Sequence, residues 1–207
     1  MLRTLKIIFN ATILVLAFIG FNAIGGQKYI EAIKDSVTNM IAQYNQDSAR
    51  KIGDFSRMNE EFVIDNTMSL AGYKAVIAEH KASGQKMIIL DSGKKPVITQ
   101  EELKSSDIDK KLKDASEKIK YRGIKVQDIT VTGRGTMEVY GQNVPFVKFE
   151  AHVTKAPISD IAGTVASVKT SDGAEKLALS LSEKKRYSQL ITSEFYKGVS
   201  ESIENKR

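Results

Sequence analysis

The chain of 207 residues contains no cysteine and only two histidines. The lack of cysteine excludes disulfides, metal sites built on thiolates, and anchoring as a lipoprotein through an acylated cysteine. The histidines, His80 and His152, each fall in a segment with strand character. Zinc binding or activation of a nucleophile would need further groups that converge on them. We interpret both as surface or hydrogen-bonded strand histidines and expect neither a metal nor a cofactor.

A strongly basic face is also lacking. The net charge is +6, of which Arg3 and Lys6 contribute two charges, so the rest of the chain carries +4. Basic and acidic residues interleave there, without the basic stripe and stacking aromatic residues that are typical of nucleic-acid-binding proteins. This pattern argues against a nucleic-acid partner and leaves a weak, nonspecific attraction to an anionic envelope surface.

The longest hydrophobic run is Ile7–Gly26. Twenty residues in a helix span about 30 Å, the thickness of a hydrocarbon core. Arg3 and Lys6 precede the run and no acidic residue occurs before or within it, so the positive-inside rule keeps the N-terminus cytoplasmic and exports the rest. Two interpretations stay open: an uncleaved anchor through Ile7–Gly26, or a signal peptide cleaved after Gly25.

Residues 27–65 are predicted to form an amphipathic helical stalk. Apolar residues recur there at alternating intervals of three and four, the spacing of one helix face. They are Ile30, Ile33, Val37, Met40 and Tyr44, and, after a change of frame, Ile52, Phe55 and Phe62. We favour packing of this face on the protein's own domain; the second interpretation is a 30–62 face that docks an envelope protein or a second copy. The predicted parts are thus 1–26, 27–65 and a globular domain at 66–207.

The first half of the globular domain is predicted to be a hairpin followed by a helix. The β-rich segments 73–81 and 86–91 are separated by a turn at 82–85, and 92–96 is a second turn. Thr99 and Glu102 form a capping box, and Ser106 with Asp109 gives a second start signal, so the helix begins in two pieces. Its apolar stripe is predicted at Leu103, Ile108, Leu112, Ala115 and Ile119, with Gly123 at its end.

The second half is predicted to be a run of strands and a last helix. Strands are expected at 125–132, 136–140, 144–154, 161–170 and 175–182, with turns at 141–143 and 171–174. A helix from 183 to 205 carries the apolar residues Tyr187, Leu190, Ile191, Phe195, Val199 and Ile203. Short links between the strands forbid a parallel sheet. The predicted fold class is therefore α+β, a mostly antiparallel sheet packed with helices as an α/β sandwich.

The order of these segments from Tyr73 onward resembles the PsbP/DcrB type of small α/β sandwich domain. The resemblance rests on the hairpin YKAVIAEHKASGQKMIILD, the helix before KVQDITVTG, the pair MEVYGQNVPFVKFEAHV, and the hairpin VASVKTSDGAEKLALSLS before the last helix. It covers about two thirds of the chain. The resemblance implies an exported domain fixed in the envelope, with no general catalytic residues to transfer. Since the acylated cysteine of the lipoprotein members is missing, anchoring would come from Ile7–Gly26.

Two basic stretches supply candidate contact residues. Gly133-Arg134-Gly135 lacks the following helix and the Lys-Ser/Thr pair of phosphate-binding loops, so we predict a bulge or tight strand link that exposes Arg134. Lys184, Lys185 and Arg186 open the predicted last helix, where positive charge is unfavourable with the helix dipole. This mismatch makes them candidates for an anionic contact, although a solvated run is the simpler interpretation.

No catalytic constellation emerges from these residues. We predict a non-enzymatic, single-pass, membrane-anchored extracytoplasmic domain that serves binding or assembly in a cell envelope, with a cytoplasmic N-terminus. The alternative is a soluble exported carrier of a small or apolar ligand, secreted or periplasmic after cleavage. A third hypothesis is an enzyme that relies on carboxylates alone.

Overall fold

The computed structural model describes residues 46–70, 73–91, 93, 96, 98–116, 120–121, 124–154 and 159–202. These residues build an eight-stranded sheet in the order β1-β2-β3-β8-β7-β6-β5-β4, in which every neighbouring pair is antiparallel. The strands are β1 (Phe62–Leu70), β2 (Tyr73–His80), β3 (Lys86–Asp91), β4 (Lys120–Tyr121), β5 (Ile124–Val139), β6 (Gln142–Thr154), β7 (Asp160–Lys169) and β8 (Glu175–Glu183).

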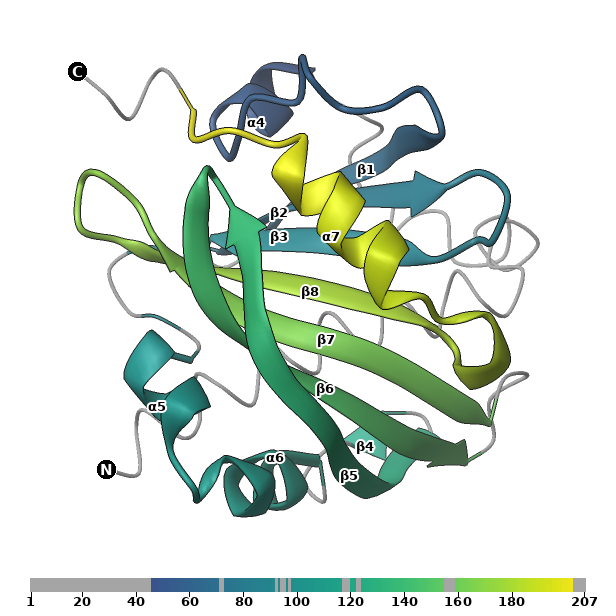
Figure 1. The fold of residues 1–207 in the computed structure, drawn as a ribbon. Helices are drawn as coiled ribbons and strands as arrows, with labels where there is room; N and C mark the ends of the chain where they lie inside the picture. Colours follow the sequence, from purple (N-terminus) through teal and green to yellow (C-terminus); the bar gives the residue numbers. More distant parts are fainter. Residues whose placement is uncertain are drawn as a thin grey trace.

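Along the chain, short helices precede β1, separate β3 from β4, and follow β8 (Figure 1). They are α4 (Gln46–Arg50), α5 (Gln100–Lys104), α6 (Ile108–Ser116), the 3-10 turn η1 (Lys184–Arg186) and α7 (Gln189–Lys197). Figure 1 shows α7 lying across the sheet and α6 beside the lower end of β5. The expected α+β class with an antiparallel sheet packed against helices is confirmed for the part of the chain that the structure describes.

Both faces of the sheet are buried. On one face, Leu103 of α5 and Ile108 of α6 pack with strand residues such as Leu179. On the other face, Phe195 and Tyr196 of α7 pack with a second set of strand residues: Val76, Ala78, Met87, Ile89, Met137, Val139, Val144, Ala166, Val168 and Ala178. The central strands β3, β7 and β8 are consequently buried along nearly their whole length. The side-chain alternation of a strand accounts for the two sets, because successive residues point to opposite faces.

Helix α7 approaches closely because the strands beneath it present small side chains. Ala166 of β7 and Ala178 and Ser180 of β8 are fully buried. The two aromatic rings of α7 fill the remaining space, and the Tyr196 hydroxyl donates to the carbonyl oxygens of Ile88 (2.9 Å) and Leu179 (2.6 Å). Burial raises the pKa of Tyr196 well above its ordinary value, so its hydroxyl stays a donor.

Several local predictions are confirmed. The hairpins β2–β3 and β7–β8 form with the expected turns. Thr99 and Glu102 make a reciprocal capping box at the start of α5, and the helix is divided at Ser105–Asp107 into α5 and α6. Leu177, Leu179 and Leu181 share one face of β8. The predicted turn at 92–96 is described only at two positions, and Ile119 and Gly123 lie outside the described residues.

Two predictions for the second half are wrong. The segments 125–132 and 136–140 are one continuous strand, β5, whose register shifts between Val131 and Gly133. The last helix does not run from 183 to 205: η1 precedes it, Ser188 caps α7, and Gly198 ends it. Leu190, predicted on the apolar face of this helix, is 82% exposed.

Residues 46–61, which we call the connecting segment, lie against the α7 side of the sheet. Ala49 and Ile52 are buried in the core that contains Phe195, and Phe55 packs at its margin. Phe62, predicted as part of the stalk, begins β1. Over 46–65 the chain is therefore part of the sheet domain, with only α4 helical. Residues 27–45 of the predicted stalk and the predicted span Ile7–Gly26 lie outside the described residues, and no helix within the described ranges is long and apolar enough to cross a membrane.

Candidate functional site

The carbonyl oxygen of Ile52 is the best-defined attachment point between the connecting segment and the sheet. Ile52 is 1% exposed and its carbonyl follows the end of α4. It accepts hydrogen bonds from the Tyr140 hydroxyl at 2.6 Å and from Lys176 Nζ at 3.0 Å. Tyr140 is at the turn between β5 and β6, and Lys176 is near the start of β8. We call this arrangement the Ile52 clamp.

Lys176 is an unusual member of the clamp because its side chain is almost fully buried. Its ammonium donates to a backbone carbonyl, and within the described ranges it forms no salt bridge with a carboxylate. The ammonium lies 5.8 Å from the centre of the Tyr140 ring, within range of a cation–π interaction. Desolvation lowers the pKa of Lys176, and the more distant carboxylates of Asp91 and Asp172 oppose that effect. Burial likewise raises the pKa of Tyr140, so this phenol remains a hydrogen-bond donor.

The connecting segment also pairs with the chain after α7. Asp54 and Ser200 exchange two backbone hydrogen bonds of 2.9 Å, forming a short antiparallel bridge. Gly53 allows this approach, because a Cβ atom there would lie 3.2 Å from Val199 Cγ1 and 3.3 Å from the Ser200 carbonyl oxygen. Gly198 faces the segment from the other side, where a Cβ would lie 3.1 Å from the carbonyl oxygen of Arg57.

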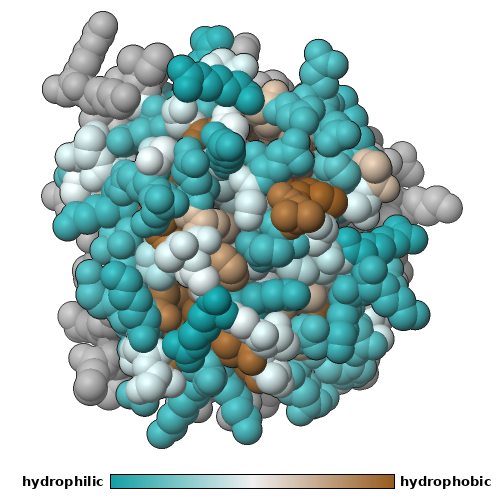
Figure 2. Space-filling view, in the orientation of Figure 1, coloured by the Kyte–Doolittle hydropathy of each residue, from teal (hydrophilic) through white to brown (hydrophobic). Residues whose placement is uncertain are grey.

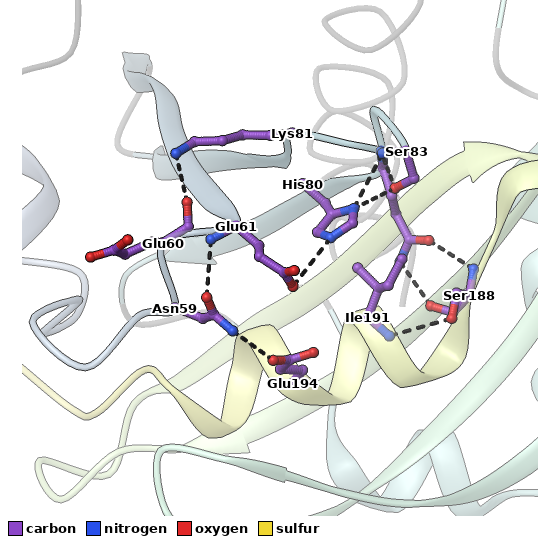
Figure 3. Close-up of polar contacts among 10 residues, drawn as sticks. Asn59, Glu60, Glu61, His80, Lys81, Ser83, Ser188, Ile191 and Glu194 are labelled. Atoms are coloured by element: carbon purple, nitrogen blue, oxygen red, sulfur yellow. Dashed lines mark hydrogen bonds and ion pairs between the residues drawn. The ribbon is translucent and has the colours of Figure 1, made fainter.

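Farther along the segment, side chains link it to α7 and to the β2–β3 turn (Figure 3). Asn59 Nδ2 donates to Glu194 of α7 at 2.8 Å. Lys81 donates from its backbone to the Glu61 carbonyl and from its side chain to the Glu60 carbonyl. The segment is therefore held at Ile52, Asp54 and 59–61, by elements that come from both halves of the sequence.

One serine, one histidine and one carboxylate lie in series in this region (Figure 3). Ser83 Oγ is 2.9 Å from His80 Nδ1, and His80 Nε2 is 3.7 Å from Glu61 Oε2. The sequence analysis did not single out this trio. However, Ser83 also donates its backbone N–H to the same Nδ1 at 3.2 Å and accepts from the Gln85 backbone, as a side chain that closes a turn does.

The burial of His80 also argues against a role for Ser83 as a nucleophile. His80 is 8% exposed and its ring packs 5.2 Å from that of Phe62. The distance to Glu61 exceeds a hydrogen bond, so the carboxylate does not fix the imidazole as it does in a hydrolytic triad. We interpret the trio as a structural link between the β2–β3 turn and the connecting segment.

The second histidine, His152, lies on the far side of the sheet order, in β6. Its Nδ1 is 3.0 Å from Asp160 Oδ1 at the start of β7, and the hydrogen bond from His152 lowers the pKa of Asp160. Both side chains are substantially exposed. Strands β3, β8 and β7 lie between β2 and β6, so the structure does not bring the two histidines together. Within the described ranges, no group of three or more His, Asp or Glu residues has the arrangement of a metal site.

Arg134 lies in the middle of β5 and not on a loop between strands. Its guanidinium donates to the Ser105 carbonyl oxygen at 2.9 Å and to Asp109 Oδ1 at 3.0 Å. It thus binds the junction of α5 and α6 to the sheet. The neighbouring Gly135 is needed for a packing reason, because the Phe146 ring crosses it and a Cβ would lie 2.9 Å from that ring. Arg134 already has intramolecular acceptors, which weakens its case as a contact residue.

Lys184, Lys185 and Arg186 form η1, one turn before α7, and not the first turn of that helix as predicted. Lys184 Nζ lies 2.7 Å from Glu150 Oε2, and that hydrogen bond raises the pKa of Lys184. Arg186 Nε lies 3.5 Å from Glu183 Oε2. All three basic residues are exposed. We call residues 184–190, from η1 into the first turn of α7, the β8–α7 elbow.

A partly buried network of hydroxyl and amide groups anchors the elbow to the sheet. Tyr187 Oη contacts Thr164 Oγ1 of β7 and donates to Gln189 Oε1 at 2.7 Å. Gln85, fully buried just before β3, donates to the Ser188 carbonyl at 3.0 Å and accepts from the Ser188 backbone at 2.8 Å. Sequence patterning gives no signal for this network, because polar residues at such positions usually face solvent.

Figure 2 shows the α7 side of the molecule as a largely hydrophilic surface on which hydrophobic side chains emerge in small, separate patches. Among the described residues, the exposed large hydrophobic side chains are Val63 at 43% and Leu190 at 82%. Leu190 belongs to the elbow. The elbow therefore combines three exposed cations with one nearly fully exposed leucine.

Comparison with known proteins finds no family model and no curated protein that matches this chain.

Proposed function

We propose that the protein is a membrane-anchored, extracytoplasmic domain that serves binding or assembly in a cell envelope and performs no catalysis. The hydrophobic run Ile7–Gly26 would be its anchor. The resemblance to PsbP/DcrB-type domains, which rests on element order, is part of the same proposal.

The observation that carries the proposal is the attachment of the connecting segment. A domain hung from a membrane needs a firm junction with its tether, and here the chain joins the core within a few residues of Gln46. The Ile52 clamp, the Asp54–Ser200 bridge and the Asn59–Glu194 hydrogen bond attach residues 52–59 to the sheet and to α7, which supports a tether that would enter the domain here.

The contacts of the candidate residues favour structural roles over chemical ones. The His80, Ser83 and Glu61 trio closes a turn, and the exposed His152–Asp160 pair joins two strands. Arg134 binds the α5–α6 junction. The buried Lys176 donates to a backbone carbonyl. Each of these groups has a structural use.

Crosslinking in the native membrane, followed by affinity purification and mass spectrometry, tests the proposal. We expect a defined set of envelope proteins to be recovered with a chain that still carries Ile7–Gly26. Recovery of the chain alone, trimmed after Gly25 and freely soluble, would overturn the anchored interpretation and favour an exported carrier. The bound small molecules released on denaturation would then be the next measurement.

A further inference from the structure

The β8–α7 elbow has a composition that the fold alone does not require. Leu190 is 82% exposed, and the side chains of Lys184 and Arg186 are 53% and 68% exposed. A single exposed leucine needs no explanation by itself. Here, however, it lies four residues after a run of three cations, on a turn that the partly buried Tyr187–Thr164 and Gln85–Ser188 contacts hold to the sheet.

The cations of the elbow are compensated unevenly. Lys184 contacts Glu150 and also feels the charge of Asp160, and Arg186 contacts Glu183, whereas Lys185 is in no ion pair within the described ranges. Both ion pairs are exposed, and exposed pairs contribute little to stability, so their cations can exchange a carboxylate for another anion at small cost. The cations also lie just before the N-terminus of α7, whose dipole offers them no favourable interaction.

We propose that the β8–α7 elbow rests on the anionic phospholipid headgroups of the bilayer that holds Ile7–Gly26, with Leu190 inserted at the interface. Cations beside an exposed aliphatic side chain are the pattern of interfacial membrane binding, in which headgroup attraction and shallow apolar burial act together. This inference rests on the proposed membrane anchor and adds an orientation to it.

The position of the connecting segment makes such contact geometrically accessible. Nineteen residues separate Gly26 from Gln46, and a chain of that length reaches at most about 65 Å. The segment meets the C-terminal end of α7 through Asp54 and Ser200, whereas the elbow lies at the N-terminal end. Nine helical residues are about 13 Å long, so the elbow is well within reach of the membrane.

Tethering also explains why a small contact is sufficient. A site held near a surface by its own chain works at a higher effective concentration than the same site on a free protein. A weak elbow contact then selects one orientation of the domain, although the same contact would not recruit an untethered protein.

Tryptophan fluorescence of the full chain in lipid nanodiscs tests the proposal, because the natural sequence has no tryptophan. The variant Leu190→Trp would be placed in discs of neutral phosphatidylcholine or of a mixture with phosphatidylglycerol, each with and without brominated acyl chains. Val63→Trp, on β1, is the matched control at the other exposed hydrophobic position.

We expect bromolipid to quench the indole of the Leu190→Trp variant in the anionic discs, with a blue shift of its emission, and to leave the Val63→Trp control unchanged. Adding Lys185→Glu and Arg186→Glu, or raising the salt to about 0.5 M, should abolish the quenching. Absence of quenching in anionic discs, or equal quenching in neutral ones, would overturn the proposal. Co-elution of the chain with the discs reports the anchor separately, so a chain that co-elutes without quenching disproves the elbow contact alone, and a chain that fails to co-elute disproves both.

Discussion

Removing both donors of the Ile52 clamp should lower the free energy of unfolding by more than the sum of the two single substitutions. Tyr140→Phe deletes the hydroxyl that donates at 2.6 Å, and Lys176→Met deletes the ammonium that donates at 3.0 Å. In either single variant, the buried carbonyl keeps one donor. In the double variant it keeps neither of them, which leaves a buried acceptor unsatisfied.

The magnitudes follow from hydrogen-bond energetics. Each lost hydrogen bond costs about 0.5–1.5 kcal/mol, and an unsatisfied buried carbonyl adds about 1–3 kcal/mol. Lys176→Met should lie at the low end, because it also removes the cost of burying a charge. We therefore expect a coupling free energy of about 1–2 kcal/mol between the two substitutions, which is within the range seen for residues that share a partner.

Urea unfolding of the full chain in a nonionic detergent, followed by circular dichroism, measures this cycle. Hydrogen exchange of the Gly53 and Asp54 amides provides a local readout, and it should accelerate most in the double variant. Lys185→Met, at an exposed position in η1, is the control for replacing a lysine by methionine. Additivity of the two substitutions within about 0.3 kcal/mol would refute the shared-acceptor reasoning.

Four further predictions concern charge, packing and reactivity. Desolvation lowers the pKa of Lys176, so the amine loses its proton at a lower pH in the folded state than in the unfolded state. The free energy of unfolding of the wild type relative to Lys176→Met should therefore rise with pH up to about 10.5. A difference that does not change with pH would contradict a buried amine. The pKa of Lys86 shifts in the opposite direction: desolvation would lower it, but the hydrogen bonds to Glu79 and Asp65 outweigh that effect and raise it. The wild type should therefore be more stable than Lys86→Met below pH 10.5, and this difference should disappear as the pH rises through the native pKa. Gly163→Ala should lower the unfolding free energy by about 1–3 kcal/mol, because its Cβ atom would clash with the Ser180 carbonyl and the Phe149 ring. Gly133→Ala is the control: its Cβ atom would lie 3.8 Å from Lys148 Cβ, so the unfolding free energy should change much less. Equal effects of the two substitutions would disprove the packing argument. A fluorophosphonate probe should fail to label Ser83, and labelling that disappears in Ser83→Ala would show that the His80 trio activates a nucleophile after all.

The features that sequence patterning predicted correctly depend on neighbours along the chain. The Thr99–Glu102 capping box and the alternation of Leu177, Leu179 and Leu181 are both complete within a few residues. Their physical causes are hydrogen bonding within one helical turn and the two-residue period of a strand. Such features form wherever the local pattern is present.

The sequence-based predictions fail where the conformation of a residue depends on a contact with a residue far away in the sequence. For Gly133-Arg134-Gly135 a bulge or a tight strand link was predicted, and the register shift between Val131 and Gly133 confirms the bulge. The division into two strands is wrong, and Gly135 is needed because the Phe146 ring of the paired strand lies over it. The helix predicted over 183–205 ends at Gly198, where a Cβ atom would lie only 3.1 Å from the Arg57 carbonyl oxygen. Lys176 was not predicted to be buried, because a lysine enters a core only when an acceptor such as the Ile52 carbonyl is supplied by tertiary structure. None of these partners lies near its residue in sequence.

Site-specific labelling in intact cells tests the proposed membrane anchoring most directly, and the cysteine-free chain needs no background substitutions. Single cysteines would be placed at Lys104, exposed on α5, and at Thr4, before the hydrophobic run. We predict that a membrane-impermeant maleimide, given access to the outer face of the inner membrane, labels Lys104→Cys but not Thr4→Cys. Both chains should remain in the membrane after carbonate extraction at a mass that includes residues 1–26. Labelling of Thr4→Cys alone, or release of a chain shortened after Gly25, would contradict the anchored extracytoplasmic domain.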